Sequence, residues 1–204
     1  MHKGIFYLVT APSGAGKTSL VKAVVDADES ICVSVSHTTR PPRSGEQNGV
    51  NYHFVNKDEF MAMLQRGDFL ESAEVYGHHY GTSQAWVDEK LGSGIDVILE
   101  IDWQGNEQVR NLRPDSCSIF ILPPRVETLR QRLEERAQDA PETIEKRMQQ
   151  AVAEISHVAE SNFIVVNDDF NSAVEDLRAI IRSRSLTTVS QVANLANLLH
   201  SLAH

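Results

Sequence analysis

A short apolar run near the N-terminus leads directly into a glycine-rich loop and then into a helical pattern. The run is Ile5–Thr10, and Lys17–Asp26 has helical spacing. The loop between them reads Ala11, Pro12, Ser13, Gly14, Ala15, Gly16, Lys17 and Thr18. A buried strand explains the run better than a signal peptide, because no cleavage-site pattern follows it. A strand joined to a helix in this way predicts the first unit of an α/β domain.

The same alternation of apolar run and helical pattern repeats along the chain. The other apolar runs are Val97–Ile101, Ser118–Leu122 and Phe163–Val166. The helical patterns that follow them are Gln104–Arg110, Val126–Ala137 and a long one from about Asn171. Continuous apolar runs are typical of strands buried on both faces of a parallel sheet. The chain therefore predicts a three-layer α/β domain.

Two stretches interrupt this alternation. Residues 37–86 contain short alternating segments, Asn51–Val55 and Phe69–Val75, with turn-rich links, and predict a small mixed α+β lobe. Residues 125–156 are rich in Arg and Glu and predict a helical hairpin, broken near Pro141. The core domain is then assigned to 1–36, 87–124 and 157–204.

The overall charge and the cysteines restrict partners and compartment. The 204 residues carry a formal net charge of −9, which argues against nonspecific binding to nucleic acid or to anionic lipid. No apolar run approaches the ~20 residues of a membrane span. Cys32 and Cys117 lie far apart and form no Cys-x-x-Cys pair. We therefore expect free thiols in a reducing compartment, with the cytoplasm as the default location.

The glycine-rich loop predicts phosphate binding. It matches the P-loop pattern G-x-x-x-x-G-K-[ST] except at its first position, where Ala11 replaces Gly. In this pattern the backbone N–H groups and the start of the following helix surround the phosphates. Lys17 would reach the β and γ oxygens, and the Thr18 hydroxyl would bind Mg²⁺. The loop alone does not separate a kinase from a GTPase or another NTPase.

A second anion site is indicated by Arg40 and Arg43, which flank Pro41 and Pro42. Two arginines around a rigid Pro-Pro could clamp one phosphate, but surface arginines on a loop are equally consistent with these residues alone.

Motifs along nearly the whole chain extend this pattern. Besides the P-loop they are Ser34-Val35-Ser36-His37-Thr38-Thr39-Arg40-Pro41-Pro42-Arg43 with Gly45-Glu46, Glu71, Tyr80-Gly81-Thr82-Ser83, Ile101-Asp102-Trp103-Gln104-Gly105, Arg132-Leu133-Glu134-Glu135-Arg136 and Val166-Asn167-Asp168-Asp169. In order and spacing this set resembles guanylate kinase of the bacterial type. The resemblance implies a P-loop kinase fold with a parallel five-stranded central sheet, an inserted GMP-binding lobe and a helical lid.

The resemblance also implies the activity and the acceptor site. The activity is reversible transfer of the ATP γ-phosphoryl group to GMP, and also to dGMP, giving ADP and GDP in purine nucleotide metabolism. The GMP-binding positions are Ser36, Arg40, Arg43, Tyr52, Glu71, Tyr80, Gly81, Thr82 and Asp102. Among them, the arginines and tyrosines hold the phosphate, while Ser36, Glu71 and Thr82 read the guanine. A carboxylate suits guanine because N1–H and the N2 amino group are neighbouring donors.

The donor site and the lid follow from the same resemblance. ATP would be held by residues 11–18, Ser19, Asn167 and Asp168. Catalysis would use Lys17, Arg43, Arg132, Arg136 and Arg147, which neutralise the transferring phosphoryl group. Thr18, Glu100 and Asp102 would hold Mg²⁺, partly through water, on the assumption that period-two geometry puts both carboxylates on one face beside the P-loop. Glu100 stands where the family usually has Asp, and Ala137 stands where it has Gly at the lid hinge.

Two other classes of protein share parts of this pattern. A non-catalytic guanylate-kinase-like module would typically lack the P-loop lysine or the arginines, all of which are present here. A P-loop GTPase would need an Asn-Lys-x-Asp motif, which is absent. ATP and GMP are thus the expected partners, with Mg²⁺ as cofactor and neither nucleic acid nor membrane. The apolar stripe of the last helix is either core packing or a subunit contact, which leaves a homo-oligomer open.

Overall fold

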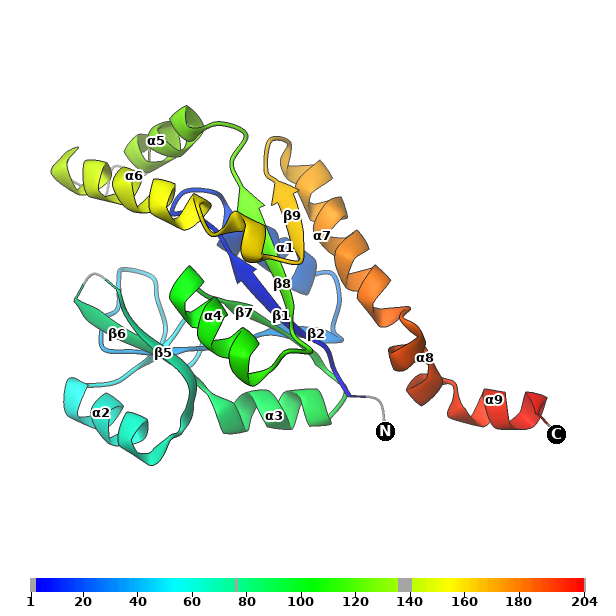
Figure 1. Ribbon diagram of the computed structural model, residues 1–204. Coiled ribbons are helices and arrows are strands. Elements are labelled where there is room, and N and C mark those ends of the chain that lie inside the picture. Colours follow the sequence, from blue (N-terminus) through cyan, green and yellow to red (C-terminus); the bar gives the residue numbers. More distant parts are fainter. Residues whose placement is uncertain (1–2, 76, 136–140, 204) are drawn as a thin grey trace.

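A computed structural model describes residues 3–75, 77–135 and 141–203 (Figure 1). The strands are β1 Phe6–Thr10, β2 Ile31–Val33, β3 His37–Thr38, β4 His53–Phe54, β5 Phe69–Val75, β6 His78–Ser83, β7 Asp96–Glu100, β8 Cys117–Leu122 and β9 Phe163–Val166. The helices are α1 Lys17–Val25, α2 Lys57–Arg66, α3 Gln84–Gly92, α4 Trp103–Leu112, α5 Val126–Glu135, α6 Pro141–Ile155, α7 Phe170–Ser185, α8 Thr188–Asn194 and α9 Ala196–Leu202, with a 3₁₀ turn at Val158–Glu160.

The central sheet has five parallel strands in the order β2-β7-β1-β8-β9. The parallel five-stranded sheet expected from the sequence is therefore confirmed. In the register of β1 with β7, Val9 lies opposite Glu100, so the end of β7 adjoins the start of the P-loop. Ligands of open parallel sheets bind at this carboxyl edge, which is where the phosphate loop lies.

Helices cover both faces of this sheet and give the three layers. Alternate residues of each strand point to opposite faces. Tyr7 and Val9 pack with α1 and α7 in one core cluster. Phe6 and Leu8 pack with α3 and α4 in the other cluster. Because both faces of β1 are buried, all five of its residues are excluded from solvent, as the apolar run predicts.

The inserted lobe contains a second, four-stranded sheet in the order β4-β3-β6-β5, with α2 beside it. The antiparallel pairing of β5 with β6 places Glu71 opposite Thr82, with a register shift between Phe69 and Glu71. The expected mixed α+β lobe is present in the fold. Its strand Phe69–Val75 has the predicted bounds, whereas the strand predicted at Asn51–Val55 shortens to two residues.

The pair α5 and α6 lies over the carboxyl edge of the central sheet (Figure 1). Leu129 and Leu133 of α5 are fully buried. They lie against the P-loop so closely that a Cβ on Gly14 would be 3.5 Å from the Leu129 carbonyl oxygen. The break in this hairpin was predicted near Pro141, where α6 begins, and residues 136–140, with Arg136 and Ala137, lie outside the described residues.

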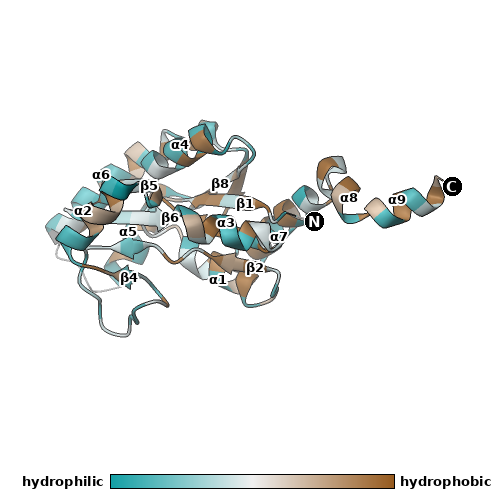
Figure 2. Cartoon of the chain, turned by 90° about the horizontal axis from the view of Figure 1, so that it is seen from below, coloured by the Kyte–Doolittle hydropathy of each residue, from teal (hydrophilic) through white to brown (hydrophobic). Residues whose placement is uncertain are grey.

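The last two helices, α8 and α9, extend away from the sheet domain (Figures 1 and 2). Their apolar side chains are largely in solvent, with Val189 86% and Leu202 74% exposed. They contact the rest of the described chain mainly through the end of α7. Within the described ranges, no helix combines the length and the hydropathy that crossing a membrane requires.

Candidate active site

The phosphate loop has the backbone that its glycines predict. Gly14 and Gly16 adopt positive φ values of 91° and 93°, which side-chain-bearing residues rarely accept. Gly16 also precedes α1 directly, and a Cβ there would lie 2.4 Å from Nδ2 of Asn167. The first turn of α1 carries no acidic side chain. The positive end of this helix is therefore available to an anion.

Lys17 and Thr18, at the start of α1, both reach across to β7 and the segment that follows it. The Lys17 ammonium donates to the Ile101 carbonyl oxygen at 3.3 Å. The Thr18 hydroxyl donates to Oε2 of Glu100 at 2.6 Å. A cation, a hydroxyl and a carboxylate are thus gathered at the edge of the sheet, next to the phosphate loop.

Asp102 has a structural role that was not predicted, in addition to the ligand role expected for it. β7 ends at Glu100, but the Ile101 N–H still donates to the Val9 carbonyl oxygen and the backbone of Asp102 is extended, so the placement expected for Asp102 stays a prediction. Asp102 is also the N-cap of α4, where its Oδ1 accepts from the Gly105 backbone N–H at 2.9 Å. The cap satisfies one of the free N–H groups of the helix and fixes the carboxylate at the carboxyl end of β7.

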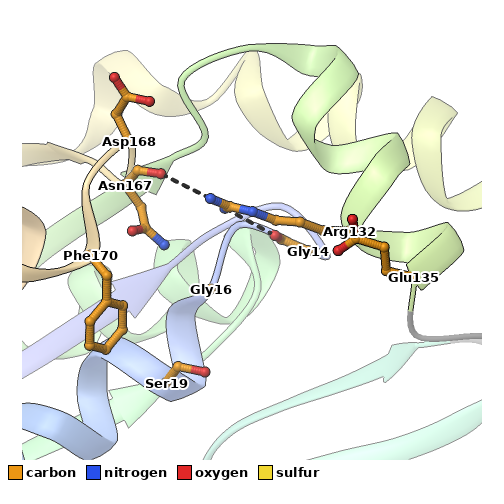
Figure 3. Close-up of a pocket in the computed structure, with 8 residues that line it drawn as sticks. All are labelled: Gly14, Gly16, Ser19, Arg132, Glu135, Asn167, Asp168 and Phe170. Carbon is orange, nitrogen blue, oxygen red and sulfur yellow. Dashed lines mark hydrogen bonds between the residues drawn. The ribbon is translucent and has the colours of Figure 1, made fainter.

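Arg132 of α5 binds the phosphate loop from the outside (Figure 3). Its guanidinium donates to the carbonyl oxygens of Gly14, Ala15 and Asn167 at 3.5, 3.3 and 3.2 Å. Asn167 in turn donates from Nδ2 to the Ala15 carbonyl oxygen at 2.7 Å. The carbonyl oxygens of Gly14 and Ala15 thereby have hydrogen-bond partners, which holds the loop in place.

A cavity of about 380 Å³ opens beside this arginine. The residues that line it are Gly14, Gly16, Ser19, Arg132, Glu135, Asn167, Asp168 and Phe170 (Figure 3). Five of them, Gly14, Gly16, Ser19, Asn167 and Asp168, belong to the donor site expected from the sequence. Glu135 and Phe170 were not predicted for it, and Phe170 is 42% exposed at the start of α7.

The inserted lobe contains a buried chain of polar groups. Oγ1 of Thr82 donates to Oε1 of Glu71 at 2.6 Å, and the hydroxyls of Ser36 and Thr82 lie 3.3 Å apart. Glu71 is only 6% exposed. The pKa of Glu71 is raised to about 7, mainly by burial and also by the charge of Asp102, while the hydrogen bonds with Thr82 oppose the shift. The three residues predicted to read a base are therefore together.

The two arginines of the Pro-Pro motif share one carboxylate. Arg40 donates to Oε1 of Glu46 at 2.7 Å, and the backbone N–H of Arg43 donates to Oε2 at 2.7 Å. The Arg40–Glu46 contact holds the pKa of Glu46 below its usual range. Glu46 thus holds the Pro-Pro loop in one conformation. This role was not predicted, although Glu46 lies in the motif that begins at Ser34. The Arg43 side chain itself is exposed.

Two tyrosines of the lobe, Tyr52 and Tyr80, lie beside Arg40. The Arg40 guanidinium lies 5.4 Å from the ring centre of Tyr52, whose ring meets that of Tyr80 edge-on at 6.0 Å. Burial raises the pKa of Tyr52, and the negative charge of Glu100 contributes in the same direction. Tyr52 therefore lies within electrostatic range of the carboxylate beside the phosphate loop.

Comparison with known proteins identifies the family. A guanylate kinase family model matches residues 3–184. Guanylate kinase of Hahella chejuensis is 56% identical over 199 residues, covering 97% of this chain and 96% of its own. That of Alkalilimnicola ehrlichii is 56% identical over 199 residues, covering 98% of each chain. The chain belongs to the guanylate kinase family.

The structural comparison agrees with this assignment. The crystal structure of guanylate kinase from Anaplasma phagocytophilum matches with a TM-score of 0.77 at 31% identity, over 92% of this chain and 89% of that one. The family, the fold and the class of nucleoside-monophosphate kinase expected from the sequence are confirmed.

Within this guanylate kinase framework the predicted residues fall into two groups. The phosphate loop with Lys17, Thr18 and Arg132 forms one group, and the polar chain with Arg40 and the tyrosines forms the other. Gly81 supports the second group from β6, where a Cβ would lie 3.0 Å from the Phe69 ring. Arg147 lies on α6, partly buried, and Arg136 falls outside the described residues.

Proposed function

We propose that this chain phosphorylates GMP, and with it dGMP, at the expense of ATP, with the residue roles given below. The observation that carries the proposal is the buried Glu71 carboxylate, which accepts from the Thr82 hydroxyl, itself 3.3 Å from the Ser36 hydroxyl, in a chain that also carries a complete phosphate loop. Guanine offers two adjacent N–H donors to such a carboxylate, whereas adenine would oppose a lone pair to it. The test is a coupled assay with ATP against GMP, AMP, CMP and UMP, in which only GMP should release ADP rapidly.

The proposed reaction is an in-line phosphoryl transfer in which the protein positions and neutralises charge. Backbone N–H groups of the phosphate loop and of the start of α1, with the Lys17 ammonium, hold the ATP phosphates. Arg40, Arg43, Tyr52 and Tyr80 hold the GMP phosphate, whose second pKa of about 6 leaves its attacking oxygen anionic near pH 7. No strong general base is therefore required. Arg132, Arg136 and Arg147 complete the charge around the transferring group.

The oxygen donors beside the loop fit Mg²⁺. This ion keeps several waters and takes only one or two protein oxygens besides substrate phosphates. Thr18 and Glu100 supply a hydroxyl and a carboxylate 2.6 Å apart, and the capped Asp102 lies nearby. Among the described residues no three acidic, His or Cys side chains form a metal cage. When bound, Mg²⁺ would neutralise charge on the β and γ oxygens.

The three parts of the chain would move against one another during this reaction. We propose 37–86 as the GMP-binding lobe, 125–156 as the lid, and 1–36, 87–124 and 157–204 as the core. Closure of the lobe and the lid over the bound nucleotides would exclude water and suppress ATP hydrolysis.

The variant Glu71→Gln should lose selectivity for guanine. The amide replaces one acceptor with a donor that faces the guanine N–H groups, so the ratio of kcat/KM for GMP to that for AMP should fall about 10²-fold or more. The measurement is the steady-state rate with each monophosphate. The exposed Glu74→Gln on the same strand is the matched control. An unchanged ratio would remove Glu71 from the base site.

GMP binding should weaken in acid because of the same carboxylate. The pKa of Glu71 is raised to about 7, so its charged, base-binding form is lost as the pH falls below 7. At pH 6 about one molecule in eleven retains this form, and the apparent Kd for GMP should be about tenfold higher than at pH 8.5. Calorimetric titration across this range measures the effect. Glu71→Gln should show only the weaker pH dependence of the GMP phosphate, and equal slopes for both proteins would contradict the assignment.

A further inference from the structure

Gly105 belongs to the motif at the start of α4, and the proposed mechanism gives it no role. It is buried in the first turn of the helix, and its φ value is not positive, so its backbone conformation does not require glycine. Glycine inside a helix is less favourable than alanine, because it loses more conformational freedom on folding. The reason for a glycine at this position must therefore lie in what packs against it.

Two neighbouring side chains occupy the space that a side chain at position 105 would need. A Cβ atom on Gly105 would lie 2.9 Å from Oε2 of Glu71, and 2.6 Å from both Cγ1 and Cδ1 of Ile101. Close carbon–oxygen contacts in proteins are about 3.3 Å or longer. The Glu71 carboxylate therefore lies against bare helix backbone, at a separation that a larger residue could not share without displacing it.

Other contacts hold Glu71 and α4 in this arrangement. Oε1 of Glu71 accepts from the Thr82 hydroxyl at 2.6 Å. Gln108 lies about one turn further along α4. Its Oε1 accepts from the Ser72 backbone N–H at 3.3 Å, and its Nε2 donates to the Ser72 carbonyl oxygen at 3.1 Å. Ser72 follows Glu71 on β5, so these two hydrogen bonds fix the spacing between strand and helix. A Cβ at position 105 would then be accommodated by side-chain movement, and the carboxylate is one of the groups that must move.

We propose that Gly105 determines base specificity, because its missing side chain leaves the space in which the Glu71 carboxylate receives guanine. This inference rests on the proposed GMP site. Two adjacent N–H donors of the base need both carboxylate oxygens in line with them. A shift of Oε2 by about half an ångström, enough to relieve the contact with a Cβ, would lengthen or bend one of the two hydrogen bonds. Gly105 acts through Glu71 and is a positioning residue.

The test is the variant Gly105→Ala, assayed with ATP against GMP and against AMP. KM for GMP should rise about tenfold, and the ratio of kcat/KM for GMP to that for AMP should fall by a similar factor, because a slightly misplaced binding group costs this much. KM for ATP, and kcat at saturating GMP, should change less than about twofold. The matched control is Gly92→Ala in the last turn of α3. There an added Cβ would meet nothing within 4 Å among the described residues, apart from the adjoining helix backbone, and all these values should equal those of the wild type.

A double-mutant cycle separates the positioning of Glu71 from a general packing effect. In the Glu71→Gln background, Gly105→Ala should lower the GMP-to-AMP ratio less than about twofold further, because the carboxylate through which it acts is gone. If Gly105→Ala fails to fold, Ile101→Val is added to every protein of the cycle, since valine lacks the Cδ1 atom that the new Cβ would meet.

Three results would overturn the inference: an unchanged KM for GMP, an equal rise in KM for ATP, or equal losses of the ratio in both backgrounds. A wild-type protein that does not prefer GMP over AMP would instead contradict the proposed function. The two failures are therefore distinguishable.

Discussion

Replacing Lys17 with alanine should lower the turnover of GMP and ATP about 10²- to 10³-fold while the protein remains folded. The ammonium now bonds a single carbonyl oxygen, that of Ile101, so its removal leaves little of the fold uncompensated. In the reaction it would neutralise charge that develops on the β and γ oxygens, and loss of one such preorganised donor typically costs this much. Steady-state GDP formation measures the loss, and circular dichroism melts measure the folding.

The matched control for this variant is Lys22→Ala on the same helix. Lys22 pairs with Asp26 at 2.7 Å, and its side chain is 70% exposed. Exposed pairs of this kind contribute little, so both activity and melting temperature should stay near the wild type. Near-normal turnover by Lys17→Ala would exclude the phosphate loop as the donor site.

Replacing Arg40 with alanine should lower kcat/KM for GMP about 10²-fold, with a much smaller effect on the affinity for ATP. Arg40 is the better ordered of the two arginines, since its side chain is only 10% exposed and is held by Glu46 and stacked near Tyr52. Truncating one partner of a buried, charge-assisted pair typically costs several kcal/mol, much of it from the charge left behind. The measurement is the initial rate at subsaturating GMP and saturating ATP.

Two further variants separate the arginine's role from a general charge effect. Arg66→Ala removes an exposed arginine of the same lobe, paired with Asp68, and should leave the rate unchanged. Arg40→Lys keeps the charge without the planar fork and should lose less than the alanine variant. If Arg40→Ala and Arg66→Ala had the same GMP kinetics, the acceptor site would have to lie elsewhere.

The central sheet could largely be predicted because its strands are buried on both faces and so are continuous apolar runs. β9 has the predicted bounds, and β1, β7 and β8 lie within a residue of theirs. The fifth strand, Ile31–Val33, was not predicted, because three consecutive apolar residues are too short a run to indicate a buried strand. The helices α8 and α9 were also missed as separate elements, because their apolar residues face solvent and no core dictates their pattern.

The residues of the candidate site differ in whether the neighbouring sequence indicates their role. The P-loop glycines and the Pro-Pro motif are contiguous, so their chemistry could be read directly. Glu135 and Phe170 come to the cavity from α5 and α7, and nothing in their local sequence indicates phosphate chemistry. Only the packing of those helices against the loop reveals them. The capping role of Asp102 was missed because the helical pattern was taken to begin at Gln104, whereas α4 begins at Trp103.

The measurement that tests the central claim most directly is nucleotide turnover by the purified protein with ATP, GMP and Mg²⁺. We expect ADP and GDP to form in equal amounts, with hydrolysis of ATP slow when GMP is omitted. Formation of ADP without GDP would identify a hydrolase and contradict the acceptor site. Absence of both products from a folded protein would contradict the transfer between two bound nucleotides on which all the residue assignments depend.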